Sequence, residues 1–268
     1  MKKYSKPITM LAVLLLTIVL TVMTTMALLA DSSFTHNTMV VGNVDIEQDE
    51  YQRDENGELE EFEQDKPALP VPVEGEIPKQ EEPVTFPEIP GEYEIYEDVE
   101  GVQDKLVVIK NTGDNEAYVR TVIAFECPEE FDPALWHIND VGMTNQYFLV
   151  IDGTRYMVRE YLYAEPLAPE AVSTPSLLQF YLDFNTTNED ILLAGDKLDV
   201  LVLSQAVQVS GFQDAQTALN AAFGTVEENA ATWFETFLAE EAAAQETTPE
   251  TTPETTAETV SDDISENG

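Results

Sequence analysis

The chain has 268 residues, of which 52 are Asp or Glu and 12 are Lys or Arg, giving a formal net charge of −40 at pH 7. This balance argues against nucleic acid and against an anionic membrane surface as partners, because both attract Lys and Arg. The hydrophobic fraction of 43% is sufficient for a packed core. Cys127 is the only cysteine, which excludes an intramolecular disulfide and a cysteine-rich zinc site.

The N-terminus is typical of an export signal. Three lysines in the first six residues precede the uncharged apolar run 8–29. Cleavage between Ala27 and Leu28 would place the small residues Thr25 and Ala27 at positions −3 and −1. We therefore expect a signal peptide over 1–27 and no membrane span in the mature protein. Cleavage after Ala30 and an uncleaved anchor are the alternatives, since the run is long enough to span a bilayer.

The mature chain opens, within residues 28–47, with a predicted strand over Thr38 to Glu47. Four residues share one face of this strand, namely Val40, Gly42, Val44 and Ile46, and the polar residues Asn43, Asp45 and Glu47 lie opposite. A lone strand with an apolar face needs a partner, which either the same domain or a neighbouring subunit can supply. These four residues are therefore a candidate donor strand, with pairing inside its own domain as the alternative.

Residues 48–92 have the composition of an acidic, Pro-rich linker or exposed insertion. Seven prolines fall between Pro67 and Pro90, and 21 of the 52 acidic residues lie between Asp45 and Glu100. Proline removes backbone donors from a strand ladder and favours extended chain, so we expect this segment outside the core. The Asp49 to Gly57 stretch does not match the spacing of a calcium-binding loop.

The core is expected over residues 93–226, where strand patterns follow one another at short spacing. The predicted strands cover 105–109, 117–127, 147–151, 155–163, 177–184 and 198–209, and Asp152-Gly153 forms a tight turn between the third and fourth. No helical pattern interrupts them before Gly211. This order predicts an all-β fold, a jelly-roll-like antiparallel β-sandwich with one or two peripheral late helices.

The late helices are predicted over Phe212 to Phe223 and over residues 227–245. Trp233, Phe234 and Phe237 supply the apolar side chains of the second helix. Residues 246–268 repeat Thr, Pro and Glu, and such a tail lacks the apolar surface to order itself.

Several segments, taken in this order, resemble the camelysin/TasA family of secreted proteins from Gram-positive bacteria. They are Ala27-Leu-Leu-Ala-Asp31 with Asn37-Thr-Met-Val-Val-Gly-Asn-Val-Asp-Ile46, Val108-Ile-Lys-Asn-Thr-Gly-Asp-Asn-Glu-Ala-Tyr-Val-Arg120, Tyr161-Leu-Tyr-Ala-Glu-Pro-Leu-Ala-Pro169, and Ala206-Val-Gln-Val-Ser-Gly-Phe-Gln-Asp-Ala-Gln-Thr-Ala-Leu-Asn220. The resemblance covers most of residues 1–43 and 105–224. The long acidic segment and the Thr-Pro-Glu tail depart from the family pattern.

This resemblance implies processing by a signal peptidase of the SipW type, a jelly-roll-like domain and an extracellular location. For the TasA branch it also implies assembly into biofilm-matrix fibres. Camelysin-type members are described as casein-cleaving metallopeptidases, which makes a metal site an alternative to test.

The sequence contains few residue patterns that would support catalysis. The only histidines are His36 and His137, without a His-Glu-x-x-His motif, and two unrelated histidines are the simpler interpretation. On the apolar face of its strand, Cys127 is expected to be a small buried hydrophobe. For Arg120 we expect a pairing within its own sheet, the alternative being a salt bridge between subunits.

The sequence therefore predicts a secreted, non-enzymatic cell-surface or biofilm-matrix structural protein that self-associates, with strand exchange between subunits as the route to fibres. It predicts no cofactor and no catalytic or metal-binding residues. A camelysin-like extracellular metallopeptidase and a non-polymerising adhesin or binding module are the alternatives.

Overall fold

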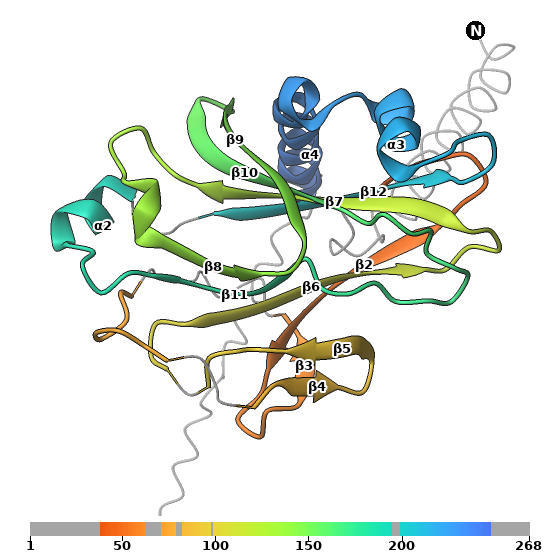
Figure 1. Ribbon diagram of the computed structural model, residues 1–268. Coiled ribbons are helices and arrows are strands. Elements are labelled where there is room, and N and C mark those ends of the chain that lie inside the picture. The colour runs from red at the N-terminus through yellow and green to blue at the C-terminus, as the bar shows by residue number, and fades with distance from the viewer. Residues whose placement is uncertain (1–37, 63–70, 79–81, 98, 195–198, 248–268) are drawn as a thin grey trace, which may run out of the picture.

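A computed structural model describes residues 38–62, 71–78, 82–97, 99–194 and 199–247. Within them, two five-stranded sheets pack face to face, and two helices cover the outer face of one sheet (Figure 1). The expected signal peptide over 1–27, His36 and residues 248–268 lie outside the described part of the chain.

The first sheet, sheet A, contains five strands, in spatial order β1 (Thr38–Val41), β12 (Val200–Gln208), β7 (Ala117–Glu126), β10 (Thr154–Leu162) and β9 (Met143–Ile151). Sheet B contains β3 (Leu59–Glu61), β2 (Ile46–Arg53), β6 (Gln103–Asn111), β11 (Leu177–Leu182) and β8 (Trp136–Asp140). A separate hairpin joins β4 (Val84–Phe86) and β5 (Ile89–Tyr93). The parallel pairing of β1 with β12 contrasts with the antiparallel pairing of the neighbouring strands in both sheets. The predicted all-β antiparallel sandwich is confirmed.

The core lies between the two sheets because each central strand turns one apolar face inward. From β7, Ile123 and Phe125 meet Leu177 and Phe180 of β11 in one buried cluster. Nine of the ten residues of β7 are buried, since its other face is covered as well. This explains why β7 has a nearly continuous apolar sequence instead of a strict alternation.

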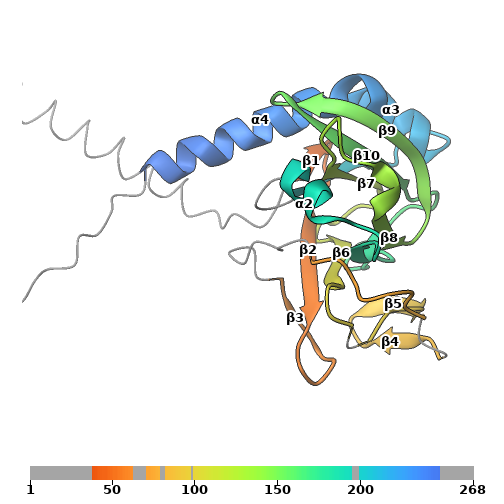
Figure 2. The same ribbon diagram turned by 90° about the vertical axis from the view of Figure 1, so that its left-hand side faces the viewer.

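Two helices provide the second cover of sheet A. They are α3 (Ala215–Phe223) and α4 (Val226–Thr247), which lie over β7, β10 and β12 in Figure 1. The helices predicted near these positions are therefore present. The C-terminal part of α4 extends away from the sheets in Figure 2. The short helix α2 (Asn188–Ala194), the single turn η1 (Pro133–Leu135) and strand β8 were not predicted.

The single strand predicted over Thr38 to Glu47 is wrong, because the structure has two strands there in different sheets. β1 ends at Val41 and β2 begins at Ile46. Gly42 lies between them with φ +95°, and a Cβ at this position would stand 3.0 Å from the Cβ of Gln208. A side chain here would be crowded and its backbone strained, and the chain crosses at this glycine from sheet A to sheet B.

The prediction of a linker or insertion over residues 48–92 is also wrong for the described part of this segment. It contains most of β2, together with β3, β4 and β5. β2 is stable despite its acidic residues because the neighbouring strand β6 is basic: Glu47 is in register with Lys110, and Glu50 forms an ion pair with Lys105. Opposite charges across a strand pair stabilise a sheet, which a pattern of acidic residues alone does not reveal.

Candidate functional sites

The structure separates the four residues of the candidate donor strand. Val40, in β1, is 42% exposed, whereas Val44 and Ile46 are only 6% and 8% exposed and belong to a buried cluster with Ile109 and Val119. These last two contacts are made within the same chain. Among these four residues, only Val40 belongs to an edge strand in the strand order of the sheets.

The sheet edges differ in how well they are protected against pairing with another strand. Three edge strands are short: β1 has four residues, β3 has three and is acidic, and β8 has five. The fourth, β9, has nine residues with no charged residue and no proline. Short length, charge and proline are the usual devices that prevent edge pairing, so β9 is the unprotected edge among the described strands.

Apolar side chains also extend from β9 beyond the sandwich. Phe148 and Val150 are 47% and 58% exposed. Tyr147 and Leu149 alternate with them and pack into the cluster that contains Phe234 of α4. One face of β9 is therefore covered by a helix, and the other is open.

A cation lies against this open face. The guanidinium of Arg155 stands 5.1 Å from the ring centroid of Phe148, and Nε donates to the carbonyl of Cys127 at 2.8 Å. The other Lys and Arg residues of the described ranges form ion pairs with carboxylates, namely Arg53, Lys105, Lys110, Arg120 and Arg159. Within those ranges Arg155 has no such carboxylate partner, although the chain as a whole is strongly acidic.

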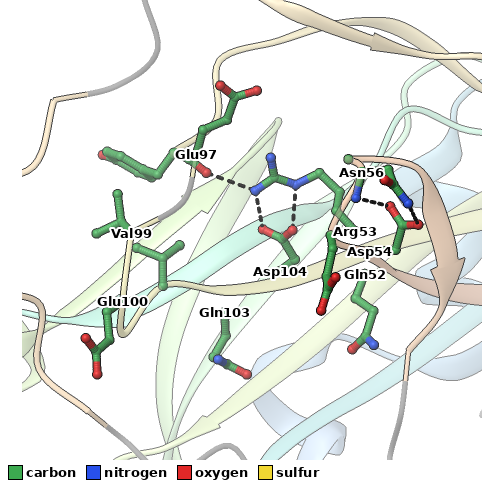
Figure 3. Close-up of a pocket in the computed structure, with 13 residues that line it drawn as sticks. Gln52, Arg53, Asp54, Asn56, Glu97, Val99, Glu100, Gln103 and Asp104 are labelled. Carbon is green, nitrogen blue, oxygen red and sulfur yellow. Dashed lines mark hydrogen bonds and ion pairs between the residues drawn. The ribbon is translucent and has the colours of Figure 1, made fainter.

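A polar cleft of about 560 Å³ lies at another part of the molecule, between the β2–β3 turn and the loop before β6 (Figure 3). Its walls include the carboxylates of Asp54, Glu97 and Glu100 and the amides of Gln52 and Gln103. The surface is mostly polar, and carboxylates outnumber the cations. The cleft therefore suits cationic or neutral polar groups better than anions or apolar ligands.

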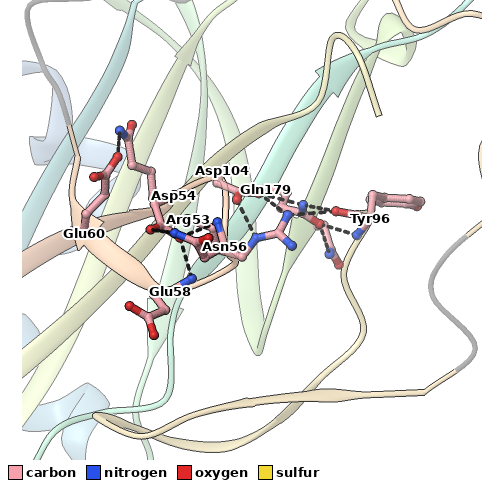
Figure 4. Close-up of polar contacts among 10 residues, drawn as sticks. Arg53, Asp54, Asn56, Glu58, Glu60, Tyr96, Asp104 and Gln179 are labelled. Atoms are coloured by element: carbon pink, nitrogen blue, oxygen red, sulfur yellow. Dashed lines mark hydrogen bonds and ion pairs between the residues drawn. The ribbon is translucent and has the colours of Figure 1, made fainter. Parts of the chain in front are cut away.

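The floor of the cleft is held by a network around Gln179, which is fully buried (Figure 4). Gln179 accepts from the backbone N–H of Tyr96 at 2.7 Å and donates to the Tyr96 carbonyl at 2.8 Å. Arg53 forms two hydrogen bonds to Asp104, at 2.6 and 3.0 Å, and a third to the Tyr96 carbonyl. These bonds join β2, β6 and β11 to the loop and give the cleft a fixed shape.

The rim of the cleft is shaped by the turn between β2 and β3. The carboxylate of Asp54 accepts from the backbone N–H groups of Asn56 and Glu58, at 2.8 Å each. Hydrogen bonding, first from the Asn56 side chain and then from the backbone, lowers the pKa of Asp54. In the parts of the chain that the structure describes, no group of three or more His, Cys, Asp or Glu residues is placed to hold a metal ion.

The remaining residues singled out from the sequence have structural partners. Arg120 is fully buried and pairs with Glu160 of the neighbouring strand at 3.3 Å, so the expected pairing within its own sheet is confirmed. Cys127 is buried as expected, and burial raises the pKa of its thiol. His137 contacts Asp183 at 2.7 Å and stacks on Tyr181.

Comparisons with protein-family models, with curated proteins and with solved structures returned no match. The resemblance to the camelysin/TasA family stays a prediction. No helix within the described residues combines the length and the apolar character that a membrane crossing requires.

Sequence patterns alone missed the residues that shape these two sites. Arg53 and Asp104 are 51 residues apart in the chain, and no local pattern links them. For β9, a signal did exist: the uncharged run from Met143 to Ile151 is unusual in so acidic a chain. Its position at a sheet edge became visible only in the fold.

Proposed function

We propose that this protein is a secreted structural protein of the cell surface or extracellular matrix, and that copies of it join by exchanging strand β1. The export signal in the sequence supports the location. The observation that carries the assembly proposal is the placement of β1, a four-residue strand paired in parallel on one side only, with Val40 and Val41 each 42% exposed.

The connection after β1 makes exchange geometrically simple. Gly42 adopts a positive φ, and the next anchored residues, Val44 and Ile46, stay in the core of their own chain. If β1 leaves its place, the same β12 edge becomes free in every copy. A β1 from a neighbour then restores the same contacts, and repeated head-to-tail exchange gives filaments unless a ring closes.

Paired cysteines test this proposal. Val40 and Ala206 are register partners on adjacent strands, where the strand spacing of about 4.8 Å fits a disulfide. We expect the Val40→Cys/Ala206→Cys protein, oxidised at high concentration and high salt, to form a covalent ladder on a non-reducing gel. High salt screens the repulsion between copies of an acidic chain.

The control is the Val40→Cys protein, which can form dimers but no ladder. The native Cys127 is fully buried and does not take part. Oxidation of the double variant that yields only monomers with an internal disulfide would refute strand exchange.

The polar cleft favours a second candidate, a non-polymerising binding module. Its fixed floor and carboxylate-rich walls form a preorganised surface for a polar ligand. Sedimentation of mature protein at rising concentration separates the two, because a binding module stays monomeric throughout.

A further inference from the structure

We propose that the acidic C-terminal segment, residues 254–266, adds as a strand to the open edge of β9 in the same chain. The edge offers nine residues of backbone without charge or proline and, on its open side, Phe148 and Val150. Unpaired strand edges bind extended peptides through main-chain hydrogen bonds, while side-chain contacts select the peptide.

The charge on this edge specifies an acidic occupant. Arg155 lies over Phe148 and has no carboxylate partner among the described residues, where the other Lys and Arg residues are paired. A peptide with a carboxylate opposite Arg155 and a β-branched residue beside Phe148 therefore complements the edge in both charge and polarity.

Residues 254–266 have this pattern. They contain no proline, and one face of an extended chain would carry Glu258, Val260, Asp262 and Ile264. The opposite face would carry mainly Thr, Ala and Ser, which suits the side of β9 where acidic α4 lies. Burial against an existing edge supplies the partner that this segment lacks by itself.

The length of chain after α4 allows the contact. Glu235 of α4 accepts from the backbone N–H of Asp152, at the end of β9, and α4 ends at Thr247. The twelve residues between Glu235 and Thr247 rise about 18 Å. The next seven residues can span about 24 Å, so the chain can return to the Ile151 end of β9 and run antiparallel to it.

Hydrogen exchange of the mature protein tests the proposal. We expect the amides of β9 that point away from β10 to exchange about tenfold more slowly in the full chain than in a variant ending at Thr247. The difference should shrink in high salt, because the Arg155 contact is electrostatic.

A substitution in the full chain tests the same contact independently. Val150→Glu adds a repelling carboxylate at an exposed site and should remove the slow exchange. Leu192→Glu is the control. It makes a similar change on α2, where Leu192 is 81% exposed, and should leave the slow exchange of β9 unchanged. Equal exchange rates in the full and shortened chains would overturn the proposal. Protection that grows with protein concentration would also overturn it, because the strand would then come from a neighbouring copy. Neither result depends on strand exchange by β1, which uses the opposite edge of sheet A.

Discussion

At the scale of single residues, Arg120 is the largest fully buried side chain in the described part of the chain, and it carries a charge. Its guanidinium is fully enclosed and bonds Glu160, Gln205 and Asn220, which come from β10, β12 and α3. It also donates to the Gly224 carbonyl and lies 5.2 Å from the ring of Trp233. A charge without water needs partners on every side, and these partners connect sheet A to both helices.

Replacing this cation should strongly destabilise the fold. We expect Arg120→Met to lower the free energy of unfolding by about 3–5 kcal/mol, because Glu160 then stays buried without its partner. Denaturant unfolding measures the loss. As a control, Lys110→Met breaks an exposed 3.9 Å pair with Glu170 and should cost less than about 1 kcal/mol. Similar losses in the two variants would contradict the structural role given to Arg120.

At the scale of elements, α4 is anchored by its first half. Val226, Ala230 and Phe234 recur every four residues and are almost completely buried against Val122 and Val158 of sheet A. The sequence indicated an apolar group at 233–237, but the fold shows that Phe234 is the residue fully enclosed. Trp233 is only half-buried, with its ring beside the Arg120 guanidinium.

Truncation of this anchor should loosen the layer of helices. We expect Phe234→Ala to reduce the free energy of unfolding by about 3–5 kcal/mol, through lost burial and the cavity that remains. Thr232→Ala, at an exposed position of the same helix, should have little effect. Thermal or denaturant unfolding followed by circular dichroism gives both values. A small loss for Phe234→Ala would mean that α4 is not part of the cooperative core.

At the scale of the whole molecule, acidic surface and buried phenols combine to limit stability at high pH. Burial, and then the charge of Asp49, raises the pKa of Tyr51 to about 12. The pKa values of Tyr156, Tyr161 and Tyr181 are raised in the same direction, each chiefly by burial. An ionised phenol is thus disfavoured in the folded state and accepted in the unfolded one, where its pKa is about 10.

The sign of the pH dependence follows from these shifts. The folded pKa lies above the unfolded value, so this contribution is fully present below about pH 10 and is lost as the pH rises toward 12. We expect the free energy of unfolding to fall steadily from pH 9 to pH 11.5, and Tyr51→Phe to make that fall shallower. Urea unfolding at several pH values checks both. A flat profile would show that the phenols ionise freely in the folded chain.

The parts of the fold that could be predicted from sequence are those with local signals. β7 was recognisable from its long run of mostly apolar residues, and the β9–β10 hairpin from its two apolar runs around Asp152-Gly153, where both turn residues have positive φ. The buried state of Cys127 followed from its place at the end of such a run. Hydrophobic patterns and turn residues depend on a few consecutive positions, so they can be recognised before the neighbouring strands are known.

The polar cleft and the open edge could not be predicted in the same way. Gln179 lay in a predicted strand, but its bonds to Tyr96 join residues 83 apart in the chain. The edge position of β9 depends on which strands pair, and strand order is a property of the assembled sheet.

The fold class, the late helices and most strands between residues 103 and 208 are encoded locally, in the hydrophobic period and the turn residues. Two features depend instead on long-range pairing: Gly42 divides the first strand between two sheets, and acidic β2 lies in the sandwich beside basic β6. Both have the same cause. The free energy of a charged or edge residue depends on what lies across from it, and that partner is supplied by a distant part of the chain.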